Sequence, residues 1–419
     1  MKFTLPEGTF PPLRLSASEA ETLAHEAQRM VLETISEFDD LVAHNRELPH
    51  NQWKLLKTRE NLAVYRTRKG YGSNHRTHRD PWSSSWSPQA PHLVSGSVYA
   101  REEEDELRLR KEATTSGDSH TTILDQQCSS SEATGSYRDR FDSIIGDSAL
   151  EASKPPRTPV VVVTGTYPGS VEDAALGNLA DTEVLWKLRS SFIGDERDDY
   201  KILTTLLRPT KADPFRFLGV KWSTKKFAFL TTQRDLLYVE SAGVLRDPET
   251  GKITMGYNLL HSIELLQIPE LRKFDIIRIK LSICFITRQY DDHSIELYCR
   301  GFLAPGGGMI GSVATSLHAE SIVLSANVIA CAYAKKLMWL TQQRRSENVQ
   351  YTNQTVETAT HCHSCTKSFK GLSGFMRFSA ACQCCKRIVC NRCQIEMKLV
   401  VDITASEVTQ RAIPFCVHL

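Results

Sequence analysis

The sequence of 419 residues has almost no excess of charge of either sign: 51 Lys and Arg stand against 49 Asp and Glu, a net charge of +2. A dedicated nucleic-acid protein needs a basic excess to neutralise phosphates, so we expect no nucleic-acid partner. The longest apolar run, "SIVLSANVIACAYA", is too short and too polar to predict a membrane span. The first residues contain no apolar signal-peptide region, so we expect an intracellular protein whose thiols are reduced.

Motifs that carry catalytic chemistry are also missing. G-x-S-x-G, H-E-x-x-H and G-x-x-x-x-G-K-[ST] do not occur in the sequence. The glycine-rich stretch "APGGGMIGS" is not followed by a lysine, so it predicts a turn into the last helix and not a phosphate cradle. His261 and His318 are interpreted as packed or surface histidines. The sequence therefore predicts a protein that is not an enzyme.

Cysteine is scarce except near the C-terminus. Four of the 12 cysteines are scattered singly, at Cys128, Cys284, Cys299 and Cys331, and the other eight fall between residues 362 and 416. In a reducing compartment such clustering indicates metal ligation and not disulfides. Six of the eight form C-x2-C pairs, each able to present two thiolates to one tetrahedral Zn²⁺: Cys362/Cys365, Cys382/Cys385 and Cys390/Cys393.

The gap between Cys385 and Cys390 is too short for neighbouring pairs to share an ion, so alternate pairs must do so. Site one is then predicted from Cys362, Cys365, Cys390 and Cys393, and site two from Cys382, Cys385, Cys416 and one further group. The pattern places that group at Leu419, which cannot bind a metal. His418, Cys384 or water completes site two, or the chain is truncated. We expect one firm zinc site and a second, weakened one.

The rest of the chain predicts an α+β protein. A capped helix is expected in 15–48, with Ser16 or Ser18 at its start, and two short strands follow it. Residues 71–157 are rich in serine and charge and predict a disordered insert. After a buried strand and two helices, several strands alternate apolar and polar residues, which predicts an antiparallel sheet with one covered face. A long amphipathic helix, about 310–342, closes the series.

The run "KWSTKKFAFLTTQRDLLYVESAGVLRD" and the closing helix ending "AYAKKLMWL" resemble the START lipid-binding domains, and the chain is similar to oomycete START/FYVE proteins. The resemblance implies a helix-grip fold, a curved antiparallel sheet with a long C-terminal helix. That fold would occupy residues 1–70 and 158–342 and enclose an apolar tunnel for one lipid. The apolar row that contains Ile279 and Leu281 fits a tunnel or a solid core equally well, and no residue of a lipid pocket can be named.

The cysteine stretch resembles a degenerate FYVE-type zinc finger, placed at 359–419 after a linker at 343–358. The family's basic motif is mostly missing, because Arg377 is the only matching base and Ala380 and Ala381 stand where histidines belong. Recognition of phosphatidylinositol 3-phosphate is therefore not carried over, although Lys386 and Arg387 favour acidic surfaces weakly.

Together these features predict a non-enzymatic lipid-binding or lipid-sensing adaptor with structural zinc. We expect it in the cytoplasm, with an acidic membrane surface as a partner and endosomal membranes as the place of peripheral recruitment. One alternative is a protein-protein or ubiquitin-pathway adaptor that docks through the zinc module. Another is an enzyme built on a helix-grip cavity, which a buried polar constellation would favour.

Overall fold

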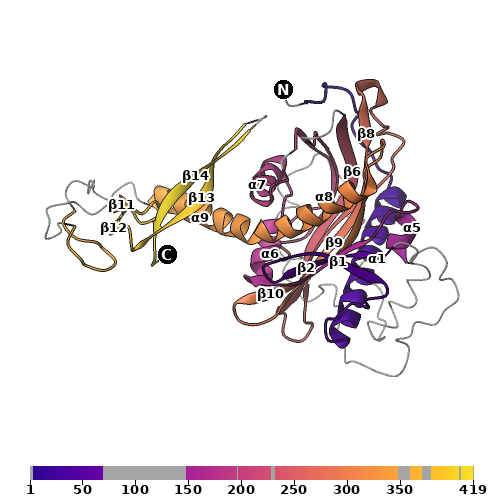
Figure 1. The fold of residues 1–419 in the computed structure, drawn as a ribbon. Coiled ribbons are helices and arrows are strands. Elements are labelled where there is room, and N and C mark those ends of the chain that lie inside the picture. Colours follow the sequence, from indigo (N-terminus) through magenta and orange to yellow (C-terminus); the bar gives the residue numbers. More distant parts are fainter. Residues whose placement is uncertain are drawn as a thin grey trace.

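The computed structural model describes residues 3–68, 148–195, 197–227, 232–347, 359–369, 379–404 and 407–418. Most of the predicted insert, together with Cys128, Arg377 and Leu419, lies outside these residues. The described chain forms a large mixed helix and sheet core, and a long helix leads from it to a small cysteine-rich module (Figure 1). This is the α+β helix-grip arrangement that the sequence predicts.

The core is built on a 10-stranded sheet in the described part of the chain. Nine strands follow one another in antiparallel order, and the tenth, β8 (Ile276–Arg278), pairs in parallel with β6. The order across the sheet is β1 (Trp53–Arg59), β2 (Leu62–Thr67), β3 (Val161–Pro168), β10 (Ser294–Ala304), β9 (Lys280–Gln289), β7 (Ile253–Ser262), β6 (Gln233–Arg246), β5 (Phe217–Lys225) and β4 (Asp199–Leu207).

One face of the sheet packs against α1 (Ala17–Ala43). Ser16, one of the two serines predicted as the cap, caps this helix, and Glu19 completes a capping box with it. The inward stripe of α1 includes Ala27, Met30 and Phe38, all at most 3% exposed. These side chains meet the apolar residues that point to this side of the strands, and this contact buries the N-terminal helix.

A short helix, α5 (Ala149–Ser153), packs beside α1 and corrects one boundary. Ala149 and Leu150 are each 4% exposed, and the Ala149 amide donates a hydrogen bond of 2.7 Å to the Glu33 carboxylate. The prediction of a disordered insert at 71–157 is therefore wrong for 148–157. The sequence has too few apolar residues there for a periodic pattern, yet Ala149 and Leu150 are enough to pack against α1.

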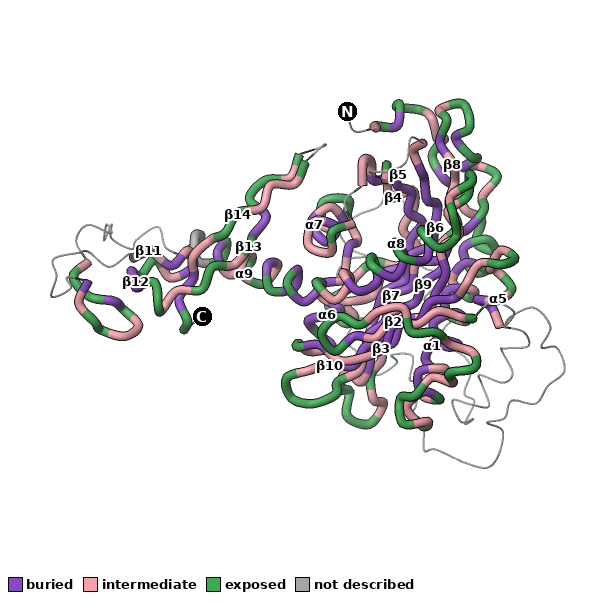
Figure 2. The backbone as a smooth tube through the Cα atoms, in the orientation of Figure 1, coloured by how far each residue is buried: buried purple, intermediate pink, exposed green. Residues whose placement is uncertain are grey.

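The opposite face is covered by α6 (Val171–Asn178), α7 (Glu183–Ile193), α8 (Gly311–Leu324) and α9 (Val328–Glu347); a 3₁₀ turn (Ser325–Asn327) joins α8 to α9. Ile322 and Val323 of α8 pack on Ile283 and Leu297 of the sheet. Both faces of the sheet are thus covered, and the purple strands in Figure 2 run between helices on either side. The expectation of one covered face was wrong, because polar strand residues that suggested a solvated face are buried in ion pairs.

The C-terminal helices differ from the prediction in two further ways. Residues Gly311–Gln343 are long and apolar enough to cross a membrane by length and composition, which the sequence reading did not expect; half of that apolar window is buried inside the fold. The helix also continues to Glu347, so the first part of the predicted linker at 343–358 is helical. Residues 348–358 lie outside the described chain.

The cysteine-rich module contains two small antiparallel sheets. One joins β11 (Ser379–Ala381) to β12 (Ile388–Cys390), and the other is the long hairpin of β13 (Gln394–Ile403) and β14 (Val408–Cys416). The hairpin reaches back along α9 towards α7 (Figure 1). There Val400 packs with Leu188 of α7 and Cys331 of α9, and Gln410 donates a 3.0 Å hydrogen bond to Ser191. The module is therefore seated on the core.

Candidate functional site

Four cysteines from the first and third C-x2-C pairs form one compact group: Cys362, Cys365, Cys390 and Cys393. Their Sγ atoms all lie within 4.8 Å of one another, and the Sγ atoms of Cys365 and Cys390 are 3.8 Å apart. A tetrahedral Zn²⁺ with Zn–S bonds of about 2.3 Å holds its sulfur ligands about 3.8 Å apart. This group could hold a metal ion, and its four thiols are the set that the spacing assigned to site one.

The backbone around this group prepares a thiolate. The amide of Cys390 donates to Cys362 Sγ over 3.3 Å. Burial works to raise the pKa of the Cys362 thiol, but the N–H groups of Cys390, Cys365 and Ser364 outweigh it and lower the pKa to about 6. Because metals bind the thiolate, this arrangement favours metal binding near neutral pH.

A second group brings together Cys382, Cys385 and Cys416, again with Sγ atoms within 4.8 Å of one another. Cys416 ends β14, and its Sγ lies 3.8 Å from Cys385 Sγ. Backbone N–H groups of Cys385 and Cys416 lower the pKa of the Cys382 thiol against the effect of burial. This group could also hold a metal ion, through three protein ligands in the described chain.

Neither of the described candidates for the fourth ligand lies within the second group. His418 is exposed and Cys384 is buried, but neither belongs to the group whose ligand atoms lie within reach of one another. Leu419, where the spacing puts the missing ligand, lies outside the described residues. The three remaining single cysteines that the structure describes, Cys284, Cys299 and Cys331, are buried in the core away from both groups.

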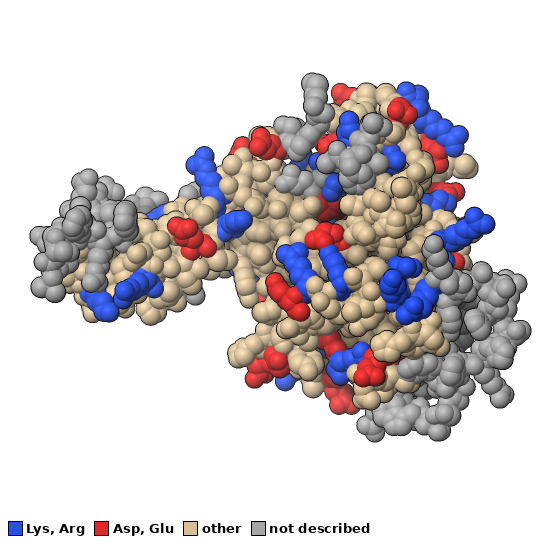
Figure 3. Space-filling view, viewed as in Figure 1, with Lys and Arg blue, Asp and Glu red and all other residues tan. Residues whose placement is uncertain are grey.

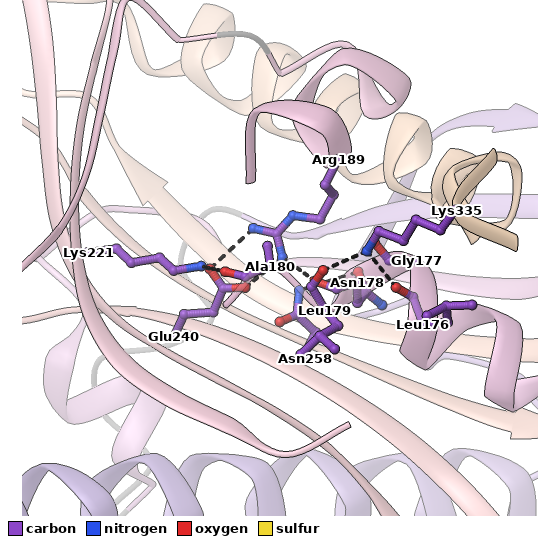
Figure 4. Close-up of polar contacts among 10 residues, drawn as sticks. All are labelled: Leu176, Gly177, Asn178, Leu179, Ala180, Arg189, Lys221, Glu240, Asn258 and Lys335. Carbon is purple, nitrogen blue, oxygen red and sulfur yellow. Dashed lines mark hydrogen bonds and ion pairs between the residues drawn. The ribbon is translucent and has the colours of Figure 1, made fainter. Parts of the chain in front are cut away.

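A buried polar cluster lies between the sheet and the α6–α7 segment (Figure 4). Glu240 of β6 accepts hydrogen bonds from Arg189 of α7 at 2.5 Å and from Lys221 of β5 at 2.8 Å. All three side chains are at most 5% exposed. Burial alone would raise the pKa of Glu240, but the two cations hold it well below its usual range, to about 2. The carboxylate is therefore charged, and it offsets the cost of burying the charges of Arg189 and Lys221.

The cations of this cluster also hold the end of α6. Lys221 donates to the Ala180 carbonyl, Arg189 donates to the Asn178 carbonyl, and Lys335 of α9 donates to the Leu176 and Leu179 carbonyls (Figure 4). Burial lowers the pKa of Lys335 to about 8. These contacts satisfy carbonyl groups that have no partner within α6, so the cluster fixes how α6, α7 and α9 sit on the sheet.

Some buried polar atoms in the same layer have no hydrogen-bond partner in the described part of the chain. They are Asn258 Oδ1 and Asp181 Oδ1 near the cluster, and His318 Nε2 on α8. Burial lowers the pKa of His318 to about 4, so its ring is neutral. Unpaired buried polar atoms are costly, and a ligand or water with polar groups would satisfy them.

Two hollows of about 370 and 320 Å³ occur on the described surface. The larger is lined by residues 270–278 and the smaller lies between α7, the start of α9 and the β13–β14 hairpin. Neither lies between the apolar sheet face and α8, where the resemblance implies a lipid tunnel. Ile279 is 7% exposed and packs with Trp186 and Tyr238. Leu281 is half-buried and packs against the same cluster.

The polar cluster of Arg189, Lys221 and Glu240 was not predicted from the sequence. A signal was present, because Lys221 in "GVKWS" and Glu240 in "YVESAG" are single charges inside strongly apolar strands. Charged residues are almost never fully buried unless paired, so such positions indicate partners elsewhere in the fold. Arg189, the partner on α7, carries no signal of its own. Two further arginines of the sheet form ion pairs: Arg278 pairs with Asp235, and Arg300 with Glu33.

No protein-family model matches the sequence, and no curated protein matches it. Among solved structures, human STARD10 is 8% identical, with a TM-score of 0.37 over 80% of this chain and 86% of that chain. Human StAR-related lipid transfer protein 5 is 10% identical, with a TM-score of 0.37 over 74% of this chain and 97% of that chain. The STAR-related lipid transfer protein of Xanthomonas axonopodis is 10% identical, with a TM-score of 0.33 over 66% and 96%. At these values the likeness carries no conclusion about ligand or activity.

Proposed function

We propose that this protein is a non-enzymatic adaptor that combines a lipid-binding helix-grip core with a C-terminal module held by structural zinc. The observation that carries the zinc part is the interleaving of the cysteine pairs. Pairs one and three form one group of thiols, and pair two joins Cys416 in the other. A module of this size has little core of its own, so metal bonds would supply much of its folding energy.

The lipid part is supported by the layer between the sheet and the helices. Apolar side chains of Leu260, Leu281 and Phe285 lie there beside the buried polar cluster and its unpaired atoms. A lipid presents an apolar chain and a polar head, and such a layer suits both parts. Entry of the lipid requires α8 or the α6–α7 segment to move, because neither of the two surface hollows opens into this layer.

Cytoplasmic location and recruitment to acidic endosomal membranes belong to the same proposal. Lys and Arg are interspersed with Asp and Glu over the face of the protein in Figure 3, in agreement with the net charge of +2. Attraction to an acidic membrane must therefore come from local groups. Lys386 and Arg387 are exposed on the module, although Arg387 is in contact with His363.

Native mass spectrometry of the purified protein tests the proposal directly. We expect zinc bound to the protein and a co-purified lipid in the same spectrum, and loss of the lipid alone on extraction with organic solvent. Zinc without lipid, together with no lipid uptake from vesicles, would contradict the lipid-binding function and leave the zinc module in place.

A second candidate function is protein docking through the module. Ile395 is 50% exposed on β13, and Val401 and Val417 are each 44% exposed on the same hairpin region. Exposed apolar side chains on a rigid hairpin suit a protein partner. Replacement of Ile395 and Val401 by serine would separate the two functions, because it should abolish partner capture and leave lipid content unchanged.

A further inference from the structure

The loop between β10 and α8 contains three consecutive glycines in the left-handed backbone region. Gly306, Gly307 and Gly308 have φ values of +63°, +55° and +78°, which residues with a side chain adopt only at a cost. None of their N–H groups donates a hydrogen bond to a described residue; the one bond within the turn runs from the Met309 amide to the Gly306 carbonyl. Successive free N–H groups in such turns form concavities that attract anions.

The side chain of Arg234 lies directly against this loop. An ideal Cβ built on Gly307 would lie 3.3 Å from Arg234 Nη2. Arg234 is 3% exposed, yet among the described residues it forms no ion pair with a carboxylate and its Nε has no hydrogen-bond partner. Only Nη1 is occupied, by the carbonyls of Thr232 and Gln233. A buried arginine without a carboxylate is rare, because its desolvation is not offset.

The charges that face Arg234 leave the position cationic. Lys225 stands opposite Arg234 in the β5–β6 register, on the same face of the sheet. Its ammonium shares the Asp195 carboxylate with Arg197. Asp275 is the one described carboxylate that acts on Arg234, and it does so from beyond ion-pair distance; burial still lowers the pKa of the guanidinium. Asp235, the next residue along β6, points to the other face and pairs with Arg278.

We infer that Arg234 and the Gly306–Gly308 loop form a binding site for a phosphate group. The site offers a guanidinium with free N–H groups on one side and, on the other, backbone N–H groups that donate to no described residue; the Arg278 carbonyl oxygen also lies beside the loop. Phosphate presents several acceptor oxygens and negative charge, and arginine binds it through parallel hydrogen bonds. The phosphate comes from the headgroup of an anionic lipid or from a soluble phosphate compound. This inference does not rest on the proposed lipid-binding function or on zinc.

The site also explains why the sequence reading rejected a phosphate cradle. The glycine stretch has no lysine after it, but its cation comes from β6, more than 70 residues earlier in the chain. The loop must be glycine for a second reason as well. A Cβ on Gly307 would lie 2.3 Å from Ile277 Cδ1 and 3.3 Å from Arg234 Nη2, so a side chain there would crowd both Ile277 and the guanidinium.

The first test replaces the cation. Thermal unfolding is measured for the wild type, Arg234→Met and Arg272→Gln in inorganic phosphate and in chloride of equal ionic strength. Arg272 is the matched control, because it removes the same charge nearby from a side chain that is 85% exposed and paired with Glu270. We expect phosphate to raise the Tm of the wild type and of Arg272→Gln. Arg234→Met should bind phosphate at least about 10-fold more weakly.

The same experiment separates a binding role from a purely structural one. A binding site holds an unpaired charge at a cost to stability, so Arg234→Met in chloride should be as stable as the wild type or more stable. A large loss of stability in chloride together with an unchanged phosphate response would overturn the inference. Equal stabilisation of the wild type by phosphate and chloride would do so too.

A second variant keeps the test valid if Arg234→Met fails to fold. Gly307→Ala should crowd the Arg234 guanidinium and strain the loop at φ +55°, and so weaken the phosphate response while Arg234 remains. Gly251→Ala is the matched control, because Gly251 has a similar φ of +67° and no atom within 4 Å of an added Cβ. A phosphate response in Gly307→Ala as strong as in Gly251→Ala would refute the role of the loop.

Vesicle flotation identifies the source of the phosphate. Phosphatidylcholine vesicles with and without phosphatidic acid are compared for the wild type and Arg234→Met. Binding that needs both phosphatidic acid and Arg234 indicates a lipid headgroup, and Ile310, which is 70% exposed beside the loop, would then face the membrane. A phosphate response in solution without vesicle binding indicates a soluble ligand. Absence of both responses in the wild type refutes the site.

Discussion

Replacement of single cysteines should show that the two groups of thiols contribute unequally to the module. Cys362→Ser removes one of four thiolates from the first group, and Cys416→Ser removes one of three described thiolates from the second. A structural zinc site contributes about 10–16 kcal/mol of apparent binding free energy at neutral pH. This exceeds the stability of many whole domains, about 5–15 kcal/mol, so Cys362→Ser should unfold the module.

The expected effect of Cys416→Ser is smaller for structural reasons. A group with three protein thiolates binds zinc more weakly, so less free energy is at stake. The β-ladder that delivers Cys416 also persists without metal, because Cys416 pairs with Gln394 at the end of β14 and the Gln383 amide donates to the Pro414 carbonyl over 2.9 Å. We therefore expect partial folding in Cys416→Ser, with the first zinc retained.

The assay is a chelator titration followed with a zinc-sensitive dye, combined with limited proteolysis of the module. Two separate release steps are expected for the wild type, one late step for Cys416→Ser and none for Cys362→Ser. Cys384→Ser is the matched control, because this thiol is 1% exposed in the same module but belongs to neither group. Leu419→Cys should move the early step to higher chelator concentration.

Three outcomes would contradict this reasoning. Simultaneous release of both ions at high chelator concentration, unchanged in Leu419→Cys, would show that the second group already has a full set of ligands. Equal proteolysis of Cys362→Ser and wild type would show that the module folds without the first ion. Loss of a zinc in Cys384→Ser would identify that cysteine as the missing ligand.

Three further predictions concern the core. Glu240→Gln should destabilise the protein by about 3–5 kcal/mol at neutral pH in urea unfolding, because two buried cations lose their partner. The pKa of Glu240 in the folded protein lies below its ordinary value of 4.5, so the stability that the carboxylate contributes is fully present above pH 4.5. The difference in unfolding free energy between variant and wild type should therefore shrink as the pH falls towards about 2. A short Gly/Ser linker in place of 71–147 should leave the Tm within a few degrees of wild type. The same linker in place of 71–157 should lower the Tm further, because it removes the buried Leu150 at a cost of about 2–5 kcal/mol. Equal Tm values for the two variants would show that α5 does not stabilise the protein. Leu281→Trp should abolish lipid co-purification with little loss of stability, and a cost of about 1–3 kcal/mol with no lipid in the wild type would instead indicate a solid core.

The sequence by itself determined the local features of this protein. The C-x2-C spacing placed two thiols on each tight turn, and the short gap between Cys385 and Cys390 already required alternate pairs to meet. Ser16 or Ser18 marked the start of α1, and two-residue alternation marked the strands of the sheet. Each of these depends on residues within a few positions of one another, where chain geometry leaves few options.

Only the tertiary structure decided which distant residues meet. The sequence around Glu240 suggests a buried partner, but only the structure shows that Arg189, 51 positions away, is that partner. The polar sequence around Leu150 predicts an insert, and only the structure shows that Leu150 packs in the core with α1. Arg234 and Gly307 have no relation in sequence, and the β6 strand and the α8 loop bring them together. A buried charge is stable only beside its partner, and the partner's position is a property of the assembled sheet and helices and not of any short segment.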